Sequence, residues 1–133
     1  SIALSYLKSN YKYYKINYEM FNNDIHIHVP EGAIKKDGPS AGMALTLAIL
    51  SALTNLNIPS DLAMTGEITL RGHILEIGGL KEKTLGALRS GIKKIIIPYD
   101  NDISDLPKEV KENIKIFKVK KFNEVLEVIK YEI

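Results

Sequence analysis

Residues 39–54 have the sequence PSAGMALTLAILSALT, which is apolar over almost its whole length. Pro39 suits the first position of a helix, because the N–H group that proline lacks has no partner within a helix at that position. The apolar residues between Ala41 and Leu53 fall on every side of a helix rather than along one stripe, and such a helix is buried. The stretch therefore predicts a helix from Pro39 to Thr54 inside the core.

The segments on either side of this helix alternate between helical and extended patterns. Before it, Ser1 to Lys15 begins as a helix that continues at least to Asn10, and residues 24–29 alternate apolar and polar side chains as a half-buried strand does. After it, Leu62 to Ile77 has the pattern of paired strands, with a turn at Arg71-Gly72. The other predicted elements are helices at 80–90, 106–113 and 122–131 and strands at 94–98 and 115–119. This alternation predicts an α/β (α+β) domain with a mixed sheet.

The size and composition of the chain limit what it can be. With 133 residues and no linker or repeat, residues 1–133 are assigned to one domain. The absence of cysteine excludes disulfides, a cysteine nucleophile and thiolate metal ligands, and it fits a reducing compartment. The net charge of +2 is too balanced to indicate a nucleic-acid partner, and the basic run 115–121 is interpreted as a solvated face. The apolar run from Ala41 to Leu53 is too short to span a membrane.

The segment DGPSAG, residues 37–42, places a serine in the first turn of the predicted buried helix. The N–H groups and the positive end of the helix dipole at that point can stabilise an oxyanion. Ala41 and Gly42 add little bulk, so a substrate backbone can approach Ser40 closely. A serine in a first turn is also common without any catalytic role, and the segment alone leaves both interpretations open.

A serine hydroxyl needs a base to become a nucleophile, and the chain has three histidines. His26 and His28 share one face of the predicted strand, but no third ligand stands at a metal-binding spacing, so we interpret them as strand residues. His73 falls in the predicted turn and is expected to be exposed. No acidic residue completes a convincing Ser–His–acid triad, although such triads have no fixed order in sequence.

Lysine is the other side chain that can act as the base, provided that it loses its proton near neutral pH. Burial and a positive electrostatic surrounding both favour that loss. Lys81 and Lys83 lie in the first turn of the predicted helix 80–90, where the helix dipole opposes a positive charge. Lys81 lies nearer the leucine stripe of this helix, whereas Lys83 lines up with its small residues, among them Gly86, which would let another backbone pack close. Periodicity does not choose between the two lysines, and an exposed cluster without function fits it equally well.

Four ordered motifs resemble the characteristic blocks of the Lon family of peptidases. They are HVPEGA at 28–33, KDGPSAG at 36–42, AMTGEITLRG at 63–72 and IGGLKEK at 77–83. By this resemblance Ser40 is the nucleophile, and Lys83, the second lysine of the last block, is its general base. The resemblance also implies supporting roles for Thr65, as a hydrogen-bond partner of the lysine amine, and for Asp37.

The resemblance carries expectations about fold and activity. It implies the Lon proteolytic fold, a mixed α/β arrangement distantly similar to the second domain of a small-subunit ribosomal protein. It implies a serine endopeptidase that degrades misfolded and short-lived regulatory proteins, as the proteolytic part of an ATP-dependent protease that assembles as a ring of six. We expect a cytoplasmic location, with the mitochondrial matrix as the alternative, and no membrane or nucleic-acid contact from this domain.

Two features depart from the family pattern. Lys35 stands where a small residue or a proline is expected, and the chain is expected to begin partway into the proteolytic domain. No G-x-x-x-x-G-K-[ST] motif occurs, so no cofactor is expected within the chain, and ATP and magnesium are expected only for an ATPase module outside it. The competing hypotheses are a non-catalytic assembly module and a phosphate site at residues 32–42, although that segment lacks the lysine-serine ending of a phosphate-binding loop.

Overall fold

The computed structural model of the chain describes residues 1–22 and 39–133. The predicted strand at 24–29, with His26 and His28, lies outside the described residues. So does the predicted loop that carries Asp37. The fold and the site are therefore built from the two described ranges.

A three-stranded parallel sheet lies at the centre of the described residues. Its strands are β1 (Leu62–Met64), β4 (Lys94–Pro98) and β5 (Lys115–Val119), which pair in the order β1-β4-β5. The register sets Ala63 beside Ile95 and Ile96 beside Phe117. The bounds of β4 and β5 are those that the sequence predicts.

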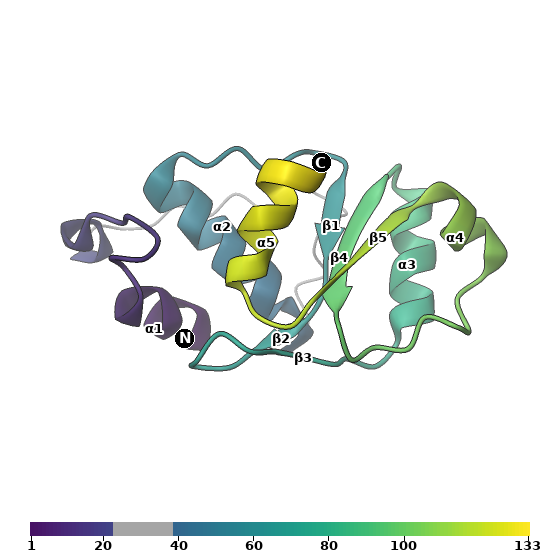
Figure 1. Ribbon diagram of the computed structural model, residues 1–133, viewed down its shortest axis with the longest axis horizontal. Helices are drawn as coiled ribbons and strands as arrows, with labels where there is room; N and C mark the ends of the chain where they lie inside the picture. The colour runs from purple at the N-terminus through teal and green to yellow at the C-terminus, as the bar shows by residue number, and fades with distance from the viewer. Residues whose placement is uncertain (23–38) are drawn as a thin grey trace.

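Helices cover both faces of this sheet (Figure 1). On one face lie α2 (Gly42–Thr54) and α5 (Asn123–Glu127), and on the other lie α3 (Leu80–Arg89) and α4 (Lys108–Asn113). The N-terminal helix α1 (Ile2–Ser9) packs against α2 rather than against the sheet. Because helices cover both faces of this parallel sheet, β1 and β4 are apolar in nearly every position, whereas the edge strand β5 exposes Lys115 and Lys118. This three-layer arrangement confirms the predicted α/β class.

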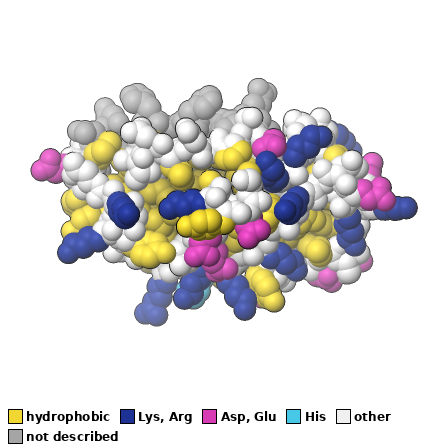
Figure 2. Space-filling model, turned by 45° about the horizontal axis from the view of Figure 1, so that its top comes forward, with side chains coloured by type: hydrophobic (Ala, Val, Ile, Leu, Met, Phe, Trp, Pro, Cys, Tyr) yellow, Lys and Arg dark blue, Asp and Glu magenta, His cyan; other side chains and the backbone are white. Residues whose placement is uncertain are grey.

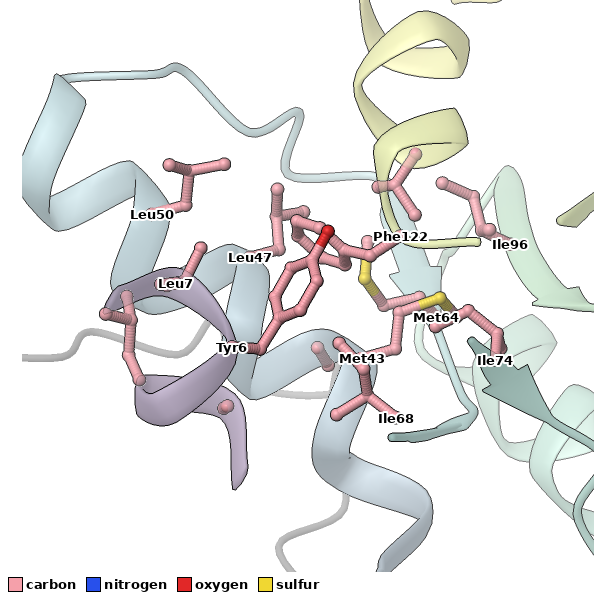
Figure 3. Packing of buried hydrophobic residues seen from close by; sticks show 14 of the residues in the cluster. Tyr6, Leu7, Met43, Leu47, Leu50, Met64, Ile68, Ile74, Ile96 and Phe122 are labelled. Carbon is pink, nitrogen blue, oxygen red and sulfur yellow. The ribbon is translucent and has the colours of Figure 1, made fainter. Parts of the chain in front are cut away.

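Alternate strand residues enter two separate cores. Leu62, Met64 and Ile96 point into the larger cluster, which they share with α1, α2 and α5. Ala63, Ile95 and Ile97 belong to a smaller cluster with α3 and α4. In the larger cluster Tyr6 lies beside Phe122, with the two ring centroids 5.7 Å apart (Figure 3). The two periods of the fold, two in strands and 3.6 in helices, account for this division.

The paired-strand prediction for Leu62–Ile77 is correct only in its second half. β2 (Glu67–Ile68) and β3 (Ile74–Leu75) form an antiparallel pair, and Gly72 adopts a φ of 84° in the connection between them. The first part, β1, pairs instead in parallel with β4. The Ile74 N–H donates to Lys120 O at 2.8 Å, and residues 73 and 121 form an antiparallel bridge, so the hairpin joins the chain just after β5. Parallel and antiparallel pairing therefore coexist in the fold, in a parallel sheet and a separate antiparallel pair.

The helices differ from their predicted bounds mainly at their ends. α1 ends at Ser9 with Asn10 as its C-cap, and Pro39–Ala41 form a 3₁₀ turn before α2 begins. α4 begins only after Pro107, and α5 continues as a π-helical turn, Val128–Glu132. A short 3₁₀ helix also spans Tyr18–Asn22. The long apolar helix α2 is buried along most of its length, although Ala52 is exposed.

Charges of both signs are interspersed on the surface, with apolar side chains between them, on the face drawn in Figure 2. The lysines of the basic run 115–121 are all exposed, which confirms their interpretation as a solvated face. One of them, Lys120, places its amine 4.4 Å from the ring centroid of Tyr99. None of the helices in residues 1–22 and 39–133 has both the length and the apolar composition needed to cross a bilayer.

Candidate active site

A lysine amine and a serine hydroxyl meet at one end of the sheet. The Lys83 amine donates a hydrogen bond to Ser40 Oγ at 2.8 Å, across 43 positions of sequence. Ser40 lies in the 3₁₀ turn that precedes α2, and Lys83 lies in the first turn of α3. Both residues are half-buried, whereas Lys81 is exposed. Of the two lysines that periodicity leaves open, the structure brings Lys83 to the serine.

The backbone of Ser40 is held by Gly66, which comes directly after Thr65, just past the end of β1. The Gly66 N–H donates to Ser40 O at 2.9 Å, and the Met43 N–H donates to Gly66 O at 3.0 Å. A Cβ atom at Gly66 would lie 2.8 Å from Ile74 Cγ2, so no side chain fits there without a shift of Ile74. The serine therefore stands on a backbone contact between α2 and the β1–β2 connection.

Gly42 has a packing role that differs from the one expected for it. A Cβ atom there would lie 3.0 Å from Ile68 Cγ2 and 3.1 Å from Ile68 N. The missing side chain makes room for β2 rather than for a substrate backbone.

The start of α3 fixes the position of Lys83. Gly79 caps the helix with a φ of 72°, and the Lys83 N–H donates to Gly79 O at 3.1 Å. Leu80, Thr84 and Ala87 form the buried side of the helix. No described residue lies within 4 Å of the place where a Gly86 Cβ would stand, so residues 1–22 and 39–133 do not make the close backbone approach expected there. Lys83 therefore reaches Ser40 by the length of its own side chain.

The pair opens into a cavity of about 310 Å³ lined by Ser40, Glu67, Glu76, Ile77, Gly78 and Lys83. Within residues 1–22 and 39–133, neither Glu67 nor Glu76 forms an ion pair with a basic side chain. Sequence reasoning did not single out the two glutamates or the Ile77-Gly78 wall as site residues. The only available signal was the position of Glu67, Ile77 and Gly78 inside two of the four family-like motifs, and Glu76 lies between those two motifs.

The site lies at the carboxyl ends of the parallel strands, where open α/β sheets commonly bind their ligands. Thr65 follows β1 directly, is 7 % exposed, and donates its N–H to Ile96 O at 3.1 Å. Among the described residues its hydroxyl forms no hydrogen bond with the Lys83 amine, so its supporting role stays a prediction. Asp37 lies outside the described residues, and its role is likewise untested.

Of the three histidines, one lies among the described residues. His73 is exposed in the β2–β3 connection, as predicted. His26 and His28 lie outside the described residues. In the part of the chain that the structure describes, no group of three His, Asp or Glu side chains is arranged to hold a metal ion.

Comparison with protein families identifies the chain. The family model described as Lon protease (S16) C-terminal proteolytic domain matches residues 1–131. The chain belongs to this family. The match runs through all four motifs, and the mixed α/β architecture is that of a Lon proteolytic domain.

Individual relatives agree with this assignment. The chain is 53 % identical over 132 residues to a Lon protease of Mycoplasma mycoides, covering 97 % of this chain and 17 % of the relative. It is 56 % identical over 128 residues to a Lon protease of Desulfatibacillum aliphaticivorans, covering 94 % and 16 %. For a Lon protease of Brucella suis the identity is 53 % over 129 residues, with 95 % and 16 % covered. The chain thus spans only about a sixth of the length of these Lon proteases.

Proposed function

We propose that this chain is a serine endopeptidase in which Ser40 is the nucleophile and Lys83 the general base. The observation that carries the proposal is the 2.8 Å hydrogen bond between the Lys83 amine and Ser40 Oγ. Both groups open into the same cavity, which has a volume of about 310 Å³. Membership of the Lon protease family supports the same reaction.

The reaction follows from the chemistry of the pair. A neutral Lys83 amine takes the proton of the Ser40 hydroxyl while Oγ attacks the carbonyl carbon of the scissile peptide bond. The tetrahedral intermediate collapses to a serine ester, and the Lys83 ammonium gives its proton to the departing amine. Water then attacks the ester, losing a proton to Lys83, and Ser40 recovers its proton as the carboxylic product leaves.

The surroundings favour two of these steps. Ser40 stands at the start of α2, where the positive end of the helix dipole stabilises the negative charge that develops on the carbonyl oxygen. Lys83 stands in the first turn of α3, which directs its amine to Ser40 Oγ for the proton transfer. We assign Thr65 and Asp37 to the support of this pair, Thr65 on the side of β1 and Asp37 three residues before the nucleophile.

The wider biology belongs to the same proposal. The relatives are about six times longer and are named Lon protease. We propose that the chain acts as the proteolytic part of an ATP-dependent protease with misfolded and short-lived regulatory proteins as substrates. In this proposal the subunits form a ring of six in the cytoplasm, ATP and magnesium bind outside this chain, and peptide cleavage itself needs no cofactor.

Covalent labelling tests the central assignment. A fluorophosphonate probe or a peptide boronate should modify the wild-type chain at Ser40, and Ser40→Ala should lose both labelling and peptide cleavage, by about a thousandfold or more. The exposed Ser60 provides the matched control, since Ser60→Ala should label normally. Equal labelling of wild type and Ser40→Ala would rule out Ser40 as the nucleophile. A folded wild-type protein that neither labels nor cleaves would favour the non-catalytic assembly module.

A further inference from the structure

A buried asparagine forms hydrogen bonds to the backbone that lines the candidate active site. The Ile77 N–H donates to Asn101 Oδ1 at 3.0 Å, and Asn101 Nδ2 donates to Ile77 O at 2.9 Å. Asn101 is only 7 % exposed, and it is one of the few buried polar side chains among the described residues. Both hydrogen-bonding groups of one backbone residue are therefore satisfied by a single side chain, 24 positions away in sequence.

The position of Asn101 follows from the parallel sheet. β4 ends at Pro98, and the Asn101 N–H donates to Pro98 O at 3.1 Å, which closes a tight turn directly after the strand. The turn sets the asparagine at the carboxyl end of the central strand, the end at which Ser40 and Lys83 meet. A side chain fixed there by its own backbone turn is a rigid support.

The segment that it binds belongs to no helix or strand, although Ile77 packs against the smaller core. On either side of it, β3 ends at Leu75 and α3 begins at Leu80. Ile77 and Gly78 nevertheless line the cavity together with Ser40 and Lys83. In an extended backbone the N–H and C=O of one residue point to the same side, and those of its neighbours point to the opposite side. Asn101 thus bonds to one side of Ile77 as the backbone of a neighbouring strand would.

We propose that Asn101 is a positioning residue for peptide binding, which holds the Ile77-Gly78 backbone as one wall of the Ser40–Lys83 site. The inference rests on the proposed peptidase function. Asn101 does not contact the reacting atoms, and Lys83 is held separately by α3, whose buried residues belong to the smaller core. Loss of the asparagine contacts should therefore loosen the wall and weaken peptide binding more than it slows the chemical step.

Two substitutions separate this role from general stability. Asn101→Leu keeps the approximate shape of the side chain and removes both hydrogen bonds to Ile77. Asn101→Asp keeps the acceptor for the Ile77 N–H and removes the donor to Ile77 O, so it remains informative if the leucine variant folds poorly. Val110→Ala is the matched control, because Val110 is fully buried in the smaller core and is not itself one of the residues that line the cavity.

The experiment uses the full-length protein that contains this chain. It measures kcat and KM for a fluorogenic peptide. It also measures the rate at which a small fluorophosphonate labels Ser40. Asn101→Leu should raise KM about tenfold while changing kcat and the labelling rate less than about threefold. Asn101→Asp should raise KM by no more than Asn101→Leu does. Val110→Ala, at a temperature where all variants are folded, should leave KM within about twofold of wild type.

The outcomes distinguish the role of Asn101 from the peptidase function on which it rests. A wild-type protein without Ser40 labelling contradicts the peptidase function itself. A wild-type protein that labels and cleaves, beside an Asn101→Leu variant with an unchanged KM, overturns only the role of Asn101. The role is also overturned if labelling falls as far as peptide cleavage, since the asparagine would then act through the serine and lysine. An equal rise of KM in Val110→Ala would show an effect of stability alone.

Discussion

The two faces of the parallel sheet each supply one half of the Ser40–Lys83 pair, and they are built differently. The face that carries α2 is covered by the larger core, which continues through α1 and the hairpin to Phe122. The face that carries α3 has a smaller core, completed by the short helix α4. Ser40 is tied by its backbone to Gly66, whereas Lys83 reaches the site with a long side chain.

This difference shows how the site depends on the fold. In the proposed reaction the serine needs an immobile backbone, because the direction of attack is set by the position of Oγ. The lysine needs a helix start that is rigid enough to aim a flexible amine at it. The sheet between the two helices places the serine backbone and the helix start that carries the lysine at the same end of the molecule. Substitutions on the two faces should accordingly affect activity and stability in different proportions.

The largest effect is expected from the lysine on the α3 face. Lys83→Arg keeps a long basic side chain, but a guanidinium does not give up its proton, so peptide cleavage should fall by about a thousandfold or more. Lys81 is exposed two residues earlier on the same helix, and Lys81→Arg should retain activity. The measurement is kcat for a fluorogenic peptide in an assembly-competent protein. Normal cleavage by Lys83→Arg beside an inactive Lys81→Arg would reverse the assignment of the base.

The sequence predicts best the elements whose signal is local. The apolar run at 39–54 contains the whole of α2, and the strands β4 and β5 coincide with their predicted bounds. β1 is different, because three residues are too few to carry a pattern that selects a partner strand. Its pairing with β4 depends on contacts far along the chain, which no local pattern encodes.

The candidate site divides in the same way. Ser40 could be singled out from a glycine-containing loop before a buried helix, and the family-like motif pointed to Lys83 where helical periodicity could not. Asn101 gives no local signal at all, because its importance lies in the backbone of Ile77, 24 positions earlier. Glu76 lines the cavity although it belongs to no helix or strand and to none of the four motifs. Such residues are found from tertiary structure alone.

The next largest effect concerns the free energy of unfolding, and it is expected from alanine substitutions at one glycine on each face of the sheet. Gly72 and Gly91 both have positive φ, 84° and 82°, but a Cβ atom at Gly72 would lie 2.8 Å from Tyr6 Cζ. No described residue lies within 4 Å of a Cβ atom at Gly91. Gly72→Ala should lower the free energy of unfolding by about 3 kcal/mol, through backbone strain and displacement of the tyrosine ring. Gly91→Ala should lower it by about 1 kcal/mol, through strain alone.

Urea denaturation of both alanine variants measures the two free energies of unfolding. Because the strain is nearly the same in both, their difference isolates the packing of the hairpin connection against α1. Equal losses of unfolding free energy in the two variants would show that the Tyr6 ring moves aside without loss of stability. The larger core would then be less tightly packed than its burial suggests.

Two tyrosines of the larger core should make the stability of the fold sensitive to alkali. The Tyr6 and Tyr14 hydroxyls share a hydrogen bond, and burial raises the pKa of both phenols. An unfolded chain loses these protons near the ordinary pKa of about 10, before the folded chain does. The stabilisation is therefore complete below that pH and is lost as the pH rises above it.

Tyr14→Phe removes one of the two groups and the buried hydrogen bond. At neutral pH it should lower the free energy of unfolding by about 1 kcal/mol. Between about pH 9 and about pH 11 its stability should then fall less steeply than that of wild type. Tyr131, which is 80 % exposed, provides the control variant Tyr131→Phe. Parallel slopes for wild type and Tyr14→Phe in denaturation at several pH values would contradict the assignment.

The smallest effect is expected at the amino end of the sheet, opposite the site, where an ion pair joins the starts of two strands. The Lys94 amine lies 3.2 Å from Asp61 Oδ2, with side-chain exposures of 27 % and 36 %. Solvent screens such a pair, so Asp61→Asn should lower the free energy of unfolding by about 0.5 kcal/mol, and molar salt should remove most of the difference. The pair of Lys108 and Glu112 is longer, at 3.6 Å, and far more exposed, so Glu112→Gln should have no measurable effect. Activity should not change in either variant, because both pairs lie away from the cavity lining. A loss of several kcal/mol in Asp61→Asn would mean that the amino end of the sheet depends on charge rather than on the two apolar cores.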